Sequence, residues 1–156
     1  MTTNNTNANQ EITHEAAGGA AVSGSASPMA EFFGEVISSY TRAQAIKDGV
    51  LVDLSAKVPA LCREHYKWPI ACTAAVWSII ESAVSNKRHC NDLEGVIHDI
   101  LWMSRKCAWY FPDDTTANFR VTITGAGRQR LFTFKMVCGP GDTSEPVLTL
   151  MLEGED

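Results

Sequence analysis

Apolar and polar residues alternate along three stretches in the second half of the chain, at residues 119–124, 131–138 and 147–152. Successive side chains of a strand point to opposite faces, so a period of two predicts strands with one buried face. Glycine-rich segments at 125–127 and 139–142 separate the stretches and are typical of turns. The pattern therefore predicts an antiparallel meander of three strands.

Residues 69–108 follow a helical period instead. Apolar residues recur every three or four positions from Pro69 to about Asn86, which predicts an amphipathic helix with the proline in its first turn. A second long helix is predicted to begin at Asn91 as its cap, because acidic residues occupy its first turn and basic residues its last. Its buried stripe is predicted to consist of Leu93, Val96, Ile97, Ile100, Leu101, Ser104, Cys107 and Ala108.

Shorter elements precede these helices. Thr41 is suited to cap a short helix that runs to Asp48, and Gly49 is suited to end it. Residues 50–54 are mostly aliphatic and predict a strand, and residues 55–66 have room for one or two helical turns. Together the elements predict an α+β domain, in which an antiparallel sheet of three to four strands packs against two long helices and a short one.

Residues 1–28 differ in composition from the rest of the chain. Thr, Asn, Ala, Gly and Ser dominate this segment, and it holds few larger aliphatic side chains. Such a segment cannot bury enough apolar surface to offset the entropy lost on ordering. We therefore predict a disordered tail at residues 1–28 and a single α+β domain at residues 29–156.

The charge of the chain argues against several classes of function. Its 156 residues carry 13 Lys and Arg against 18 Asp and Glu, a formal net charge of -5. A nucleic-acid-binding protein usually carries a basic excess, so nucleic acid is not the expected partner. No apolar run is long enough to span a bilayer, and no secretory signal is recognisable. The odd count of five cysteines predicts free thiols in a reducing cytoplasm.

The second long helix carries an additional apolar face. At about 100° per residue, Trp102 and Trp109 point away from the buried stripe, and His98 and Arg105 flank them. Trp and Arg are enriched where proteins bind one another, which makes these four residues a candidate partner-binding surface. The alternative interpretation is a helix that is buried on both sides, because large exposed apolar patches are rare on monomers.

A second candidate surface lies around the first predicted hairpin. Arg120, Arg128 and Arg130 form a local basic region, with no acidic residue between positions 115 and 141. These arginines could contact an anion or a nucleic acid. The simpler interpretation is a solvated face of the sheet, since three arginines rarely hold nucleic acid unaided.

Metal ligands and nucleophiles occur in the sequence but do not form a recognisable motif. Two residues separate Cys62 from His65. His89 and Cys90 are adjacent, so their side chains diverge, and this pair does not fit the spacing of ligand pairs in structural zinc sites. Cys138 precedes a glycine-rich turn, yet its place in the strand alternation makes it a core residue. We therefore expect no metal, no cofactor and no catalytic residue.

Four blocks of sequence, in the same order, resemble a family of unknown function that is encoded on phages, plasmids and integrative elements. They comprise residues 39–54, residues 69–77, residues 99–103, and residues 137–142 with 145–147. The resemblance covers about residues 36–156. It implies a mobile-element context, and the family supplies no activity, cofactor or catalytic residue.

The resemblance and the lack of a catalytic motif lead to an expected function. Small accessory proteins of mobile elements often counter host defence by binding a host protein. We expect a non-catalytic protein of this kind in the bacterial cytoplasm, which inhibits a CRISPR or restriction component stoichiometrically. The alternative is a small enzyme that acts on a nucleotide or modifies a defence protein, with Cys138, Asp142 and Arg42 as its residues. The sequence leaves the oligomeric state open.

Overall fold

A computed structural model describes residues 40–110 and 114–155 of the chain, and the predicted tail at residues 1–28 lies outside these residues. The described part alternates short helices and strands before two longer helices and three longer strands. In chain order the elements are α2 (Arg42–Lys47), β1 (Leu51–Asp53), α3 (Leu54–Lys57), α4 (Pro59–His65), β2 (Ile70–Thr73), α5 (Ala74–Ser85), α6 (Leu93–Tyr110), β3 (Thr116–Thr122), β4 (Leu131–Pro140) and β5 (Pro146–Leu152).

The strands form one sheet of five, in the order β1-β2-β5-β4-β3. The pairs β1–β2, β4–β5 and β3–β4 are antiparallel, as the alternating pattern predicts for the last three strands. The pair β2–β5 is parallel. The α+β class is therefore confirmed, but the prediction of an antiparallel sheet with three to four strands is wrong, because the sheet is mixed and has five.

The strand β2 accounts for this difference. The sequence predicts a helix that begins at Pro69, whereas residues 70–73 form a strand and α5 begins at Ala74 with Thr73 as its cap. Ile70, Ala71 and Cys72 are all buried. Periodicity cannot distinguish a short, fully buried strand from a buried turn of helix, since both appear as an unbroken apolar run.

The start of α6 also differs from the prediction. Asp92, not Asn91, provides the cap, because its Oδ1 accepts a hydrogen bond of 2.7 Å from the backbone N–H of Gly95. The amide of Asn91 instead donates to the backbone carbonyls of Ala83 (3.1 Å) and Thr124 (2.7 Å). Asn91 therefore ties the loop before α6 to the end of α5 and to the hairpin after β3.

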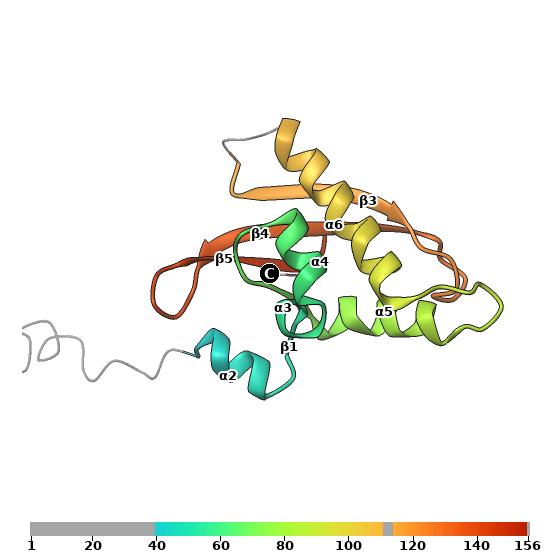
Figure 1. Ribbon diagram of the computed structural model, residues 1–156, viewed down its shortest axis with the longest axis horizontal. Coiled ribbons are helices and arrows are strands. Elements are labelled where there is room, and N and C mark those ends of the chain that lie inside the picture. Colours follow the sequence, from blue (N-terminus) through green and yellow to red (C-terminus); the bar gives the residue numbers. More distant parts are fainter. Residues whose placement is uncertain (1–39, 111–113, 156) are drawn as a thin grey trace, which may run out of the picture. The chain divides into compact units, whose positions relative to one another are not determined.

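Helices α4, α5 and α6 pack against one face of the sheet and enclose the core. In Figure 1, α4 and α6 cross in front of the strands. The largest side chain that is completely buried belongs to Phe134 of β4, whose ring lies 5.9 Å from that of Phe119 and 6.2 Å from that of Phe132. The helices contribute Cys62, Val76, Ile80, Ala83, Val96, Ile97, Ile100 and Leu101 to this core.

Two residues that are distant in sequence, Arg42 of α2 and Asp142, attach helix α2 to the sheet. The Arg42 guanidinium donates to Thr149 Oγ1 and to the carbonyl of Leu148, both at 2.8 Å. The Asp142 carboxylate, from the turn after β4, accepts hydrogen bonds from the backbone N–H groups of Arg42 (2.7 Å) and Ala43 (2.9 Å). Because Thr149 alternates with buried core residues along β5, Arg42 binds the face of the sheet opposite α5 and α6.

Candidate functional site

The two tryptophans of α6 are exposed. Trp102 retains 47% and Trp109 79% of their accessible surface, whereas Ile97, Ile100 and Leu101 of the same helix are fully buried. The helix is therefore not buried on both sides by the described part of the chain. The predicted orientation of the two tryptophans, away from the core stripe, agrees with this exposure.

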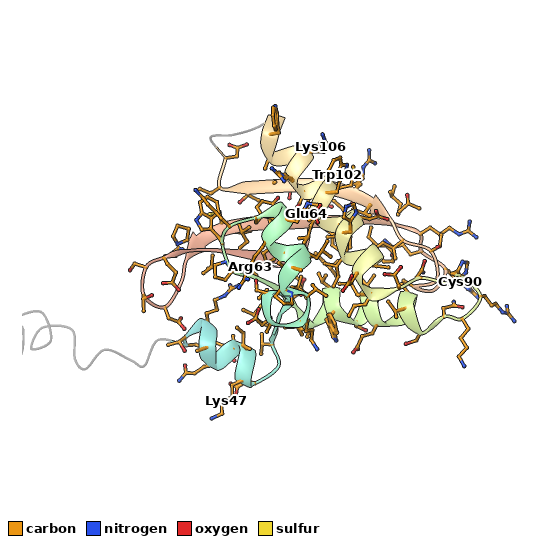
Figure 2. The ribbon with its side chains drawn as sticks, in the orientation of Figure 1. Lys47, Arg63, Glu64, Cys90, Trp102 and Lys106 are labelled. Atoms are coloured by element: carbon orange, nitrogen blue, oxygen red, sulfur yellow. The ribbon has the colours of Figure 1, made fainter. Side chains whose placement is uncertain are left out.

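The side chains around Trp102 hold its indole in place. The ring of His98 stacks on it, with centroids 6.0 Å apart and planes inclined by 16°. The ammonium of Lys106 lies 4.7 Å from the ring centroid, within the range of a cation–π contact. Arg105 reaches across to α4, where its Nη1 donates to the carbonyl of Glu64 at 3.2 Å. Figure 2 shows Trp102 and Lys106 together on α6, with Glu64 on the neighbouring helix.

The exposed apolar surface extends beyond the predicted residues. Trp102, Arg105, Lys106 and Trp109 line one hollow, and a second hollow along the edge strand β3 shares Lys106 with it. Met103 (40% exposed) and Leu131 (49% exposed) lie on the second hollow, so that four of the six large exposed apolar residues in the described ranges gather here. We call this region the α6 surface; it consists of Trp102, Met103, Arg105, Lys106, Trp109, Arg120 and Leu131.

The α6 surface is cationic. The residues that line its two hollows include three cations and no carboxylate, although the chain as a whole has a net charge of -5. Arg120 belongs to this surface, whereas Arg128 and Arg130 are exposed in the loop between β3 and β4 and line neither hollow. The structure thus divides the three predicted arginines between two places.

His65 is a further residue of this region, and the sequence interpretation missed its position beside the tryptophans. It ends α4, is only 6% exposed, and lies with its ring centroid 5.0 Å from that of His98 and 6.3 Å from that of Trp102. Neither of its ring nitrogens has a hydrogen-bond partner among the described residues. Burial lowers the pKa of His65, and the neighbouring His98 and Arg105 lower it further, while Glu64 opposes the shift.

The residues of the alternative enzyme hypothesis do not meet at one site. Arg42 and Asp142 lie together at the start of α2, where both are engaged in hydrogen bonds to the backbone or to Thr149. Cys138 pairs with Leu148 in the sheet and packs against the core, which is the opposite face from Thr149. A nucleophile on one face cannot be served by an arginine and a carboxylate on the other.

The other sequence candidates are dispersed. All five cysteines lie in the described part of the chain and are free thiols. Cys62 is buried on α4, whereas His89 and Cys90 are exposed in the loop between α5 and α6. Within residues 40–110 and 114–155, no group of three or more His, Cys, Asp or Glu side chains could hold a metal ion, and no helix is long and apolar enough to cross a membrane.

The described residues thus define a small α+β domain with one exposed helix face that is aromatic and cationic. The chain belongs to DUF6573, a family of unknown function, whose model matches residues 29–156. Comparisons with curated proteins and with solved structures give no match.

Proposed function

We propose that this protein is a non-catalytic binding protein, which uses the α6 surface to bind one partner protein stoichiometrically. The observation that carries the proposal is the gathering of the exposed apolar residues Trp102, Met103, Trp109 and Leu131 around two adjoining hollows, while the opposite side of α6 is buried in the core. Large aromatic side chains provide most of the energy at protein interfaces, because they bury much apolar area at a small cost in conformational entropy.

The charge of the surface favours a partner of complementary charge. Arg105, Lys106 and Arg120 lie among the apolar residues, and no carboxylate lines the two hollows. A partner with an acidic rim around an apolar centre would complement this arrangement, and like charges would repel a basic surface. The chain's acidic net charge would also disfavour nucleic acid as a competitor.

The partner that we propose is a host protein of the bacterial cytoplasm, a component of a CRISPR or restriction system that the protein inhibits at equimolar dose. The resemblance of the sequence to accessory proteins of mobile elements supports this choice. An inhibitor that occupies a surface needs no catalytic residues, which is consistent with the separation of Cys138 from Arg42 and Asp142.

The decisive experiment compares capture of a partner by the wild type and by the double variant Trp102→Ala/Trp109→Ala. Both indoles are exposed, so the double variant is expected to fold. The matched control is Val50→Ala, which truncates an exposed apolar residue in the turn between α2 and β1.

We expect the wild type and Val50→Ala to retain the same host protein from a lysate at a ratio near one to one. The double variant should lose at least 100-fold in affinity for that purified protein by calorimetry, since interface tryptophans each contribute about 2 kcal/mol or more. Full affinity in the folded double variant would exclude the α6 surface as the binding site. Inhibition at a catalytic dose would favour the enzyme alternative.

A further inference from the structure

The buried imidazole of His65 lacks the polar partners that such a group normally has. Both ring nitrogens are inaccessible and unpartnered among the described residues, and the side chain is only 6% exposed. A buried nitrogen without a hydrogen bond costs about 1–3 kcal/mol. Such a group in a native protein needs an explanation, and a bound water or ion is one of them.

His98 on α6 lies where a second ligand would be needed. The ring centroids of His65 and His98 are 5.0 Å apart and their planes are inclined by 66°. Two imidazoles on one tetrahedral zinc ion, with Zn–N bonds of about 2.0–2.1 Å, place their ring centroids roughly 5 Å apart. The separation of the two rings therefore satisfies one condition of joint coordination.

We infer that His65 and His98 form a binding site for one divalent transition-metal ion of the kind that imidazole prefers, with Zn²⁺ as its probe. No third His, Cys, Asp or Glu side chain of the described ranges completes a cluster, so water fills the remaining positions. Two protein ligands hold zinc more weakly than the three or four of catalytic and structural sites. The ion would link the end of α4 to the middle of α6.

The surroundings of the two rings are consistent with this role. Asp99 Oδ1 lies 3.6 Å from Nδ1 of His98, so Nε2 is the ring nitrogen that remains open to an ion. His98 retains 44% of its side-chain exposure, which gives an ion a route from solvent. Arg105 lies near His65, and its positive charge would weaken the binding of a cation there.

The test is a calorimetric titration of the chelator-treated, reduced protein with Zn²⁺, for the wild type and three variants. His65→Gln and His98→Gln each remove one ligand. His89→Gln is the matched control, because His89 is exposed in the loop before α6 beside Cys90, the other place where a zinc ion could bind. Circular dichroism establishes that each variant is folded.

We expect one Zn²⁺ per chain in the wild type and in His89→Gln, and a loss of at least tenfold in affinity in His65→Gln and His98→Gln. If His65→Gln does not fold, the half-exposed His98→Gln decides the question alone. No zinc binding by the wild type, unchanged binding by His98→Gln, or loss in His89→Gln would overturn the inference. Because the titration uses the protein alone, its outcome is independent of the proposed partner.

Discussion

Among the described residues, only the side chain of Asp142 accepts hydrogen bonds from the first two backbone N–H groups of α2. Replacing Asp142 by alanine removes these hydrogen bonds. The carboxylate receives hydrogen bonds from Arg42 and Ala43 at 2.7 and 2.9 Å, while Thr41 caps Gln44 in the next position. A short helix of six residues has few internal hydrogen bonds of its own. Its attachment to the sheet therefore depends strongly on these contacts.

The expected magnitude follows from the kind of hydrogen bond. Hydrogen bonds to a charged group contribute about 1.5–3 kcal/mol each when buried, but Asp142 is exposed and water replaces part of the loss. Losing a helix cap costs about 0.5–2 kcal/mol, and the charge–dipole attraction adds about 0.3–1 kcal/mol. We expect about 1–2 kcal/mol, which is a factor of about 5–30 in the local opening equilibrium.

Hydrogen exchange of the backbone amides measures this opening directly. The amides of Ala45 and Asp48, which bond to Thr41 and Gln44 within α2, should exchange about 5- to 30-fold faster in Asp142→Ala. The amides of β4 and β5 should keep their protection. Asp114→Ala is the matched control, because it removes the same charge from an exposed position that precedes β3.

A double variant tests whether the two contacts act on one unit. Arg42→Ala removes the two hydrogen bonds to β5, and if α2 detaches as a whole, Arg42→Ala/Asp142→Ala should open little more than the more severe single variant. Unchanged protection of α2 in Asp142→Ala would refute the reasoning. Strictly additive effects would show that each residue supports a separate part of the helix.

Three further outcomes can be measured on the purified protein. Burial raises the pKa of the Cys72 thiol to about 12, so above pH ~9 the unfolded state releases a proton that the folded state keeps. The free energy of unfolding in urea should therefore fall by up to about 1.4 kcal/mol per pH unit from pH ~9 upward, and Cys72→Val should reduce that slope. A thiol reagent at neutral pH should label the exposed Cys90 first and leave Cys72 unmodified until the protein unfolds, which mass spectrometry of digests would show. Phe134→Ala should lower the free energy of unfolding by about 3–5 kcal/mol in urea denaturation, because Phe134 is completely buried, and a loss below 1 kcal/mol would contradict its place in the core.

Periodicity predicted the elements whose two faces differ. β3 and β4 each bury alternate residues, such as Phe119 and Val121, and leave those between them more accessible, so the period of two could be recognised in the sequence. The buried stripe of α6 could be predicted in the same way from the spacing of Val96, Ile97 and Ile100. Turn residues located the hairpins, since glycine has positive φ at Gly125 and Gly127.

Features that depend on contacts between distant segments could not be predicted. The parallel pairing of β2 with β5 joins Ile70 to Leu148, and no local pattern encodes such a partner. The tryptophan face of α6 was predicted from its own helix, but Leu131 and Arg120 reach the same surface from strands. No sequence pattern marks His65 either, because the proposed metal site depends on the distance between its ring and that of His98.

The position of β5 limits the order in which the strands of the sheet can pair during synthesis. β5 lies between β2 and β4 in the sheet, yet among the described residues it is the last of the five strands in sequence. During synthesis the pairs β1–β2 and β3–β4 can form first, and each then exposes the strand edge that β5 will occupy. Open edges of this kind pair readily with other chains. We therefore expect a nascent chain that pauses before residue 146 to be more prone to aggregate than the full-length chain.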